Sequence, residues 1–312
     1  GIKVFRGCRF RGEADFRDFS TDGGMLIEDC VFEGGLSASG SRFGRALEIR
    51  SSTMIPLRGE AKGDLVDMER ITCGDLLVSD CSVRGSLDLP GVTAARLQFS
   101  DLSLLGSMTF RFSVIEQYVS MSGLICGGDL DFYGAVVTHN YLSLDGPFLL
   151  AGNFDAGFLR VGTGVFIDSD TGENSEIKGN TSFQGAIIPS CLRLHNVGVR
   201  GEINGRYLNA GTVGIFGPEV SLGKITEDAD DAKASAGPVR IGGGIDFSFA
   251  KIENSALFID IEVTEEGSSP DSPSLSLCSA VIGHDLCLFA TGGKDRSEGF
   301  YIEDGRNCTA IL

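Results

Sequence analysis

The chain contains no tryptophan, only three histidines and eight prolines among its 312 residues, and no apolar run long enough to span a membrane. The longest candidate, FLLAGNF at 148–154, is far too short for a span. No stretch keeps an apolar period of 3.6 residues over the length of a helix. We therefore expect neither a membrane span nor a helical protein.

Several signatures of known chemistry are also absent. The chain has no CxxC pair, no HExxH and no nucleophile-elbow motif, and Gly162–Gly164 lacks the third glycine of a dinucleotide fingerprint. His139, His195 and His284 are far apart in sequence. Nine cysteines are scattered without zinc spacing, and we interpret them as small buried residues. Free cysteines indicate a reducing compartment and hence a cytoplasmic location.

A repeated five-residue pattern is what the chain does contain, together with 44 glycines. Its third and fifth residues are apolar, and this alternation is typical of a β-strand. Glycine-headed and glycine-free versions alternate, so the full period is about 22 residues with two strands. The clearest copies are GSLDL (85–89), ARLQF (95–99), GSMTF (106–110), QYVSM (117–121), GDLDF (128–132), NYLSL (140–144) and GNFDA (152–156).

Such short strands cannot bury their apolar faces alone, so units repeating at this period must stack on their neighbours. We predict an all-β fold, a right-handed parallel β-solenoid (β-helix) of about 22 residues per coil and roughly 11 to 13 coils. Corner glycines should adopt positive φ. The predicted inward columns are Leu87, Met108, Leu130 and Phe154, and Leu97, Val119 and Leu142; the predicted corners are Gly91, Gly123, Gly134 and Gly146.

Four segments interrupt the repeat. Residues 51–70 blur the pattern, and the other three are rich in acidic or turn residues with little hydrophobicity. We therefore expect a single solenoid domain over 1–312, with loop excursions at 51–70, 168–178, 218–238 and 264–273.

The first fifty residues place phenylalanine at the centre of five-residue units, as in CRFRG (8–12), ADFRD (14–18), CVFEG (30–34) and SRFGR (41–45). This region resembles pentapeptide-repeat proteins. The resemblance implies a solenoid. Some members of that family imitate DNA and engage topoisomerases, so the resemblance also raises duplex mimicry as a hypothesis for this chain.

A second resemblance rests on VGTGVFI (161–167), FQGAIIPSCLRLHNVGVRGEI (183–203) and VIGHDLCLFA (281–290). Residues 161–205 and 241–290 resemble a family of large bacterial solenoid proteins that are labelled membrane-associated oxidoreductases. This resemblance also implies a parallel β-solenoid, and it does not establish redox chemistry.

The net charge of −17 restricts the partners. A strongly acidic protein is repelled by nucleic acid and by anionic membranes, so we expect no direct nucleic-acid binding. A cationic partner or a metal ion is favoured.

Acidic residues on the glycine-headed strands form one candidate site. Asp129, Asp131 and Asp155 should face outward, where carboxylates on neighbouring strands are suited to calcium. Pectate-lyase-like β-helix enzymes use such carboxylates with a basic residue, and Arg111 and Arg160 are in range. The motifs of polygalacturonase-type enzymes are absent, and a solvated polar face explains the same residues.

A second candidate site lies on the other strands, where Asp75, Arg96, Tyr118 and Tyr141 should form an outward row. Arg96, Tyr118 and Tyr141 are suited to binding a partner, as a platform for sugar rings or for an arginine or peptide. The alternative is a row of cross-strand pairs that only stabilises the sheet.

These observations favour a non-catalytic acidic scaffold that binds a macromolecular partner, with duplex mimicry as one mode. The alternative is a carbohydrate-active β-helix enzyme, a lyase or hydrolase, that uses the acidic strand face with calcium. The chain begins inside a repeat, at Ile2 and Val4, without a polar or helical cap. We expect a protein partner or a second copy, as in a homodimer, to cover a solenoid end.

Overall fold

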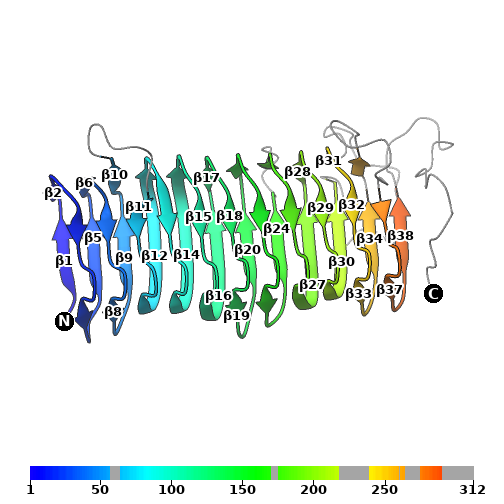
Figure 1. The fold of residues 1–312 in the computed structure, drawn as a ribbon, viewed down its shortest axis with the longest axis horizontal. Coiled ribbons are helices and arrows are strands. Elements are labelled where there is room, and N and C mark those ends of the chain that lie inside the picture. Colours follow the sequence, from blue (N-terminus) through cyan, green and yellow to red (C-terminus); the bar gives the residue numbers. More distant parts are fainter. Residues whose placement is uncertain (57–63, 170–174, 218–238, 260, 264–274, 290–312) are drawn as a thin grey trace, which may run out of the picture.

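The computed structural model describes residues 1–56, 64–169, 175–217, 239–259, 261–263 and 275–289. These residues form 38 strands and no helix, arranged in a 27-stranded and an 11-stranded sheet. Neighbouring strands pair in parallel, from β1 (Lys3–Arg6) with β5 (Met25–Glu28) to β34 (Ala256–Ile259) with β38 (Leu286–Phe289). The coils stack along one axis from the N-terminal to the C-terminal end (Figure 1). The predicted parallel β-solenoid is confirmed.

Each coil has four strand positions, where the sequence pattern predicts two. One full coil contains β19 (Val136–Val137), β20 (Leu142–Asp145), β21 (Leu149–Leu150) and β22 (Phe154–Asp155), and we number the sides of the coil 1 to 4 in this order. The recognised patterns NYLSL and GNFDA form sides 2 and 4. The segments between them, too short to show a period, also pair with the neighbouring coils.

Side 2 is the most regular. It stacks twelve strands, which agrees with the predicted number of coils. They are β1, β5, β9 (Leu47–Arg50), β12 (Thr72–Val83), β14 (Thr93–Leu104), β16 (Val114–Ser122), β20, β24 (Val165–Asp168), β27 (Ile187–His195), β30 (Asn209–Phe216), β34 and β38.

Side 4 is the separate 11-stranded sheet. Its strands are short because the chain bends sharply on both sides of them. They are β3 (Ala14–Asp15), β7 (Leu36–Ser37), β11 (Asp64–Asp67), β13 (Ser86–Asp88), β15 (Met108–Thr109), β18 (Leu130–Asp131), β22, β26 (Thr181–Ser182), β29 (Ile203–Asn204), β32 (Ile245–Asp246) and β36 (Leu275–Ser276).

Sides 1 and 3 complete the coil, in part through the ends of the long strands β12, β14, β16, β27 and β30. The separate strands of side 1 are β4 (Ser20–Thr21), β8 (Arg42–Phe43), β19, β23 (Arg160–Val161), β33 (Lys251–Ile252) and β37 (Val281–Ile282). Those of side 3 are β2 (Arg9–Phe10), β6 (Val31–Glu33), β10 (Thr53–Ile55), β17 (Ile125–Cys126), β21, β25 (Ser175–Ile177), β28 (Val197–Val199), β31 (Val239–Ile241) and β35 (Ile261–Val263).

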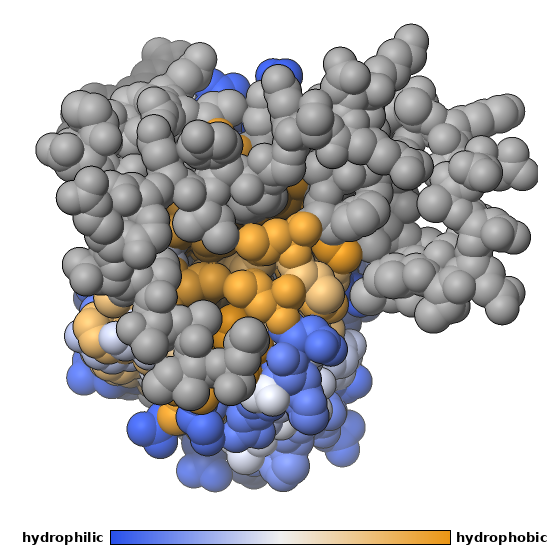
Figure 2. Space-filling model, turned by 90° about the vertical axis from the view of Figure 1, so that its right-hand side faces the viewer, coloured by the Kyte–Doolittle hydropathy of each residue, from blue (hydrophilic) through white to orange (hydrophobic). Residues whose placement is uncertain are grey.

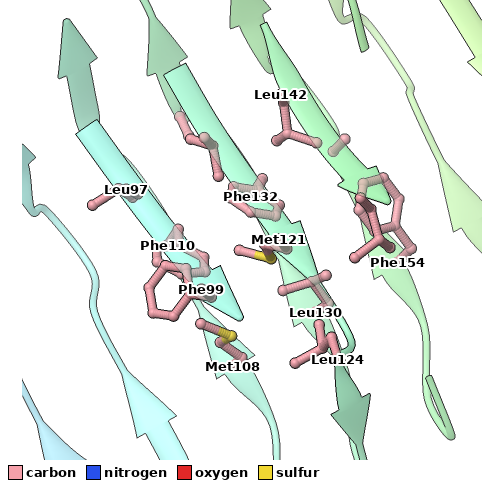
Figure 3. Close-up of a cluster of buried hydrophobic side chains, with 14 of the residues drawn as sticks. Leu97, Phe99, Met108, Phe110, Met121, Leu124, Leu130, Phe132, Leu142 and Phe154 are labelled. Carbon is pink, nitrogen blue, oxygen red and sulfur yellow. The ribbon is translucent and has the colours of Figure 1, made fainter. Parts of the chain in front are cut away.

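The core is a set of apolar columns inside the coils, and both predicted columns are present. Leu87, Met108, Leu130 and Phe154 are register partners on side 4. Leu97, Val119 and Leu142 are register partners on side 2. All seven side chains are at most 3% exposed. Figure 3 shows members of the two columns pointing into the same interior, so one continuous core supports every side of the coil.

Positive φ at the predicted corner glycines is confirmed. Gly91, Gly123, Gly134 and Gly146 have φ of 67°, 63°, 66° and 74°. Glycine adopts this conformation without the Cβ clash that other residues meet, so it turns the chain at little cost.

Two of the segments predicted as excursions contain strands of the coil, while their residues 57–63 and 170–174 lie outside the described residues. Residues 51–70 contain β10 and β11, and residues 168–178 contain β25. Met54, Val66 and Ile177 fill core positions there, so the coil is maintained although the sequence pattern is blurred. Residues 218–238 and 264–273 lie outside the described residues.

The eight cysteines that the structure describes are all free thiols. Among the described residues there is no helix long and apolar enough to cross a membrane. The last described coil exposes part of the core, because Leu275, Leu277, Leu286 and Leu288 are only partly buried. Figure 2 shows apolar side chains at this end of the molecule. A partner or second copy at an end stays a prediction.

Candidate functional site

The predicted outward row on side 2 exists as a contact network. Asp75, Arg96 and Tyr118 are register partners on β12, β14 and β16. Nε and Nη2 of Arg96 donate to the two carboxylate oxygens of Asp75, at 2.8 and 2.5 Å. The rings of Tyr118 and Tyr141 are stacked, with centroids 5.7 Å apart and planes 16° from parallel. The structure therefore brings Arg96, Tyr118 and Tyr141 together.

The row continues beyond the predicted residues. The ring of Phe166 packs edge-on against Tyr141, with centroids 6.1 Å apart. Cζ of Arg193 lies 5.1 Å from the centroid of Phe166, and its guanidinium is paired with the carboxylate of Asp168. We call Arg96, Tyr118, Tyr141, Phe166 and Arg193 the aromatic ladder. An arginine ends it on each side, and each arginine is held by an aspartate.

The sequence pattern does not predict Phe166 as a member of the row, because Phe166 lies two residues after the row position of its coil. It is in register with Ser143, whereas the row position in its coil is Gly164. A Cβ added to Gly164 would come within 2.6 Å of Cζ of Phe166, so the ring occupies the space that the glycine leaves. The signal that reveals it is a glycine two residues before an aromatic residue.

The ladder is partly exposed, and its charges are paired. The side chain of Arg96 is 42% exposed and that of Asp75 is 19% exposed. The hydrogen bonds that Arg96 donates to Asp75 raise the pKa of the Arg96 guanidinium further above its ordinary range. The ladder crosses five neighbouring coils on side 2. It offers ring faces and two fixed guanidinium groups, which are binding features.

The predicted metal ligands have structural contacts of their own. Oδ1 of Asp129 accepts hydrogen bonds from the backbone N and from Nδ2 of Asn153, at 2.7 and 3.0 Å. Oδ1 of Asp131 accepts from the backbone N of Tyr133, and Oδ1 of Asp155 accepts from that of Gly157, both at 2.8 Å. These bonds hold the side 4 corners in place.

Asp131 and Asp155 lie on adjacent strands in different environments. Asp131 is paired with Arg111, whereas burial raises the pKa of Asp155. The hydrogen bond with Asp131 raises the pKa of Arg111, which makes it a poor general base. No three His, Cys, Asp or Glu side chains of the described residues come close enough together to hold a metal ion. Calcium at Asp129, Asp131 and Asp155 therefore lacks a grouped ligand set.

The other chemical candidates remain dispersed. His195 is in β27, while His139 and His284 precede β20 and β38. The three imidazoles thus belong to three different coils. Arg160 begins side 1 on β23, across the corner from the acidic side.

One feature of the surface is not predicted by the strand pattern. Large aromatic residues line the corner between sides 4 and 1, where the pattern has no position for an apolar residue. Phe112, Phe158, Tyr207 and Phe249 are 64%, 49%, 58% and 50% exposed. We call these four residues and the adjacent Tyr133 the aromatic corner.

Comparison with known proteins does not assign this chain to a family. No family model, no curated protein and no solved structure matches this chain. The resemblances to pentapeptide-repeat proteins and to the bacterial solenoid family therefore stay expectations, and function must be inferred from the surfaces themselves.

Proposed function

We propose that the protein is a non-catalytic scaffold that binds a protein partner on the aromatic ladder. The observation that carries this proposal is the partly exposed stack from Arg96 to Arg193, fixed at both ends by ion pairs. Arginine and tyrosine are enriched among the residues that dominate binding energy at protein interfaces. Because these side chains are already held in place, binding costs them little conformational entropy.

The charge of the described coils favours a protein partner over duplex mimicry. The described residues hold 19 Lys and Arg against 27 Asp and Glu, a net charge of −8, while the whole chain carries −17. Twelve coils at about 4.8 Å each make a rod of roughly 55 Å. A DNA duplex of that length carries about 30 phosphate charges. The net charge of the described rod is only −8, far below that of the duplex. Several of its carboxylates are also paired with arginine.

The proposal is tested by removing the two central rings. We expect affinity isolation from the source cells to recover one stoichiometric protein with the wild type and not with Tyr118→Ser/Tyr141→Ser. Tyr207→Asn, which removes a ring from another surface, is the matched control. The purified partner should then bind the double variant at least tenfold more weakly in calorimetry. Equal affinity for both forms would refute the proposal, and a partner displaced by duplex DNA would instead support mimicry.

A carbohydrate-active enzyme is the second candidate, favoured by the unequal pair Asp131 and Asp155. Carboxyl groups in different environments serve as acid and base in glycoside hydrolysis. If the protein is such an enzyme, incubation with a polysaccharide panel, with and without added calcium, releases reducing or unsaturated ends from at least one substrate. Asp155→Asn should abolish that release, and release that persists in this variant would exclude the pair as its source.

A further inference from the structure

The aromatic corner follows one backbone position through successive coils. In successive coils this position is held by Asp18, Gly40, Arg70, Gly91, Phe112, Gly134, Phe158, Gly185, Tyr207, Phe249 and Ser279, each with positive φ. Backbone hydrogen bonds link them from coil to coil, from Gly91 N to Arg111 O and then from Phe112 N to Tyr133 O. The corner therefore accepts glycine, a polar residue or a large aromatic residue, and from Gly91 to Tyr207 glycine and aromatic residues alternate.

An aromatic residue is the unfavourable choice for folding at this position. Phe112, Phe158, Tyr207 and Phe249 have φ between 55° and 61°, a region that costs a residue with a side chain roughly 1–2 kcal/mol. Their rings are about half exposed or more, so burial does not compensate fully. Glycine at Gly134 and Gly185 turns the same corner without either cost, so these rings serve something other than the fold.

The rings form a row of contacts along the corner. Phe112 and Phe158 each pack edge-on against Tyr133, with centroids 5.9 and 5.4 Å away, and Tyr207 is stacked on Phe249 at 5.3 Å. The alternating glycines give the rings room. A Cβ on Gly134 would lie 2.8 Å from the Phe112 ring, and the same holds for Gly185 and Phe158. Phe112, Phe158 and Tyr207 recur every second coil, about 10 Å apart.

Polar groups border the rings on side 4. Arg111 is paired with Asp131 beside Phe112, and Cζ of Arg111 lies 5.8 Å from the Tyr133 centroid. Arg206 is paired with Asp246 at 2.7 Å beside Tyr207. Both arginine side chains are 53% exposed. The corner thus offers apolar ring faces together with fixed donors and acceptors, repeated along the rod.

A peptide cannot add to this corner as an extra strand. The backbone N of Phe112, Phe158 and Tyr207 already donates to the next coil, at 3.1, 2.8 and 3.2 Å. Strand addition requires an open sheet edge. A ligand here must be held by ring stacking and by side-chain hydrogen bonds, and it must extend along the rod to use several coils.

We propose that the aromatic corner binds a linear, neutral polysaccharide that lies along the solenoid axis. The apolar faces of its pyranose rings stack on Phe112, Phe158 and Tyr207. Its hydroxyl groups exchange hydrogen bonds with the Arg111–Asp131 and Arg206–Asp246 pairs. A polymer with a short repeat matches a surface that repeats every second coil, and the negative net charge disfavours an anionic chain. This surface is separate from the aromatic ladder and goes beyond the proposed protein partner.

Affinity electrophoresis of the full chain tests the site. Native gels would contain hydroxyethylcellulose, glucomannan or xylan, with polygalacturonate as the anionic comparison. The test variant is Phe112→Asn/Phe158→Asn, because asparagine tolerates positive φ and the fold should be retained. Phe112→Gly/Phe158→Gly repeats the test with the residue that the corner accepts most readily. The control is Tyr118→Ser/Tyr141→Ser on the ladder.

We expect at least one neutral polysaccharide to retard the wild type and the ladder variant equally. Both ring variants should bind this polysaccharide at least about tenfold more weakly than the wild type does. Three results would overturn the proposal: no retardation by any neutral polysaccharide, equal retardation of the ring variants, or stronger binding of an arginine-rich peptide that the ring variants lose. The ladder variant separates this site from the proposed protein site, since it should lose only the protein partner.

Discussion

The carboxylate of Asp168 is buried at the end of β24 and accepts a hydrogen bond from Nε of Arg193, 2.9 Å away on the next coil. The same guanidinium lies over the ring of Phe166. One arginine therefore neutralises a buried charge, joins two coils and ends the aromatic ladder.

We expect Arg193→Met to lower the free energy of unfolding by about 3 kcal/mol, because it leaves a buried carboxylate without its cation. Chemical denaturation followed by circular dichroism measures this. Arg200→Met is the matched control: Arg200 and Glu176 form a more exposed pair, so its loss should cost about 1 kcal/mol or less. Equal effects of the two substitutions would contradict the assigned role of Arg193.

A new charge at either of two neighbouring residues on β14 should change the stability of the protein by very different amounts. Leu97 is fully buried and Gln98 is exposed, because successive side chains of a strand point to opposite faces. Leu97→Asp should leave the protein largely unfolded at room temperature, since it places an unpaired charge in the core column. Gln98→Asp should shift the melting temperature by no more than a few degrees. Comparable melting of both variants would show that the register is wrong.

Removing the ring of Phe112 should not destabilise the protein. Phe112→Asn should keep or raise the melting temperature, because asparagine tolerates the positive φ that strains phenylalanine. A fall of several degrees would mean that the ring is part of the stabilising packing.

The same ring should determine the cost of filling Gly134. Gly134→Ala should lower the free energy of unfolding by about 1–2 kcal/mol, from its φ of 66° and the clash with Phe112. In a Phe112→Asn background the cost should be smaller, since only the backbone strain remains. A double-mutant cycle measures this coupling, and strictly additive effects would place the ring elsewhere.

The buried thiols should be unreactive in the native state. Burial raises the pKa of Cys73 to about 12 and the pKa values of Cys81 and Cys126 to about 11. At pH 8 the reactive thiolate is therefore scarce at these three positions, and its fraction rises only as the pH approaches 11. Alkylation mapped by mass spectrometry should label the partly buried Cys8, Cys278 and Cys287 first, and Cys73, Cys81 and Cys126 only in denaturant. Rapid native labelling of Cys73 would contradict this.

The local pattern of the chain was sufficient to predict the stacked columns. Leu87, Met108, Leu130 and Phe154 recur at nearly constant spacing, and parallel stacking is the arrangement that buries all of them at once. The pattern could not reveal the additional strands on sides 1 and 3. A two-residue strand such as β19 has no internal period, and it is defined only by its pairing with β16 and β23.

By itself, the sequence determined the all-β solenoid, its period, its core columns and the row from Asp75 to Tyr141, because these depend on alternation along a strand and on repetition between coils. Only the tertiary structure decided how the surfaces are assembled. Phe166 joins the aromatic ladder because Gly164 leaves space beneath it, and Phe112 and Phe158 meet through Tyr133. These contacts join residues that lie on different coils and at different positions of the repeat. They therefore depend on the stacking of the coils and on the vacant volume beside each glycine. Neither of these can be predicted from a short segment of the sequence.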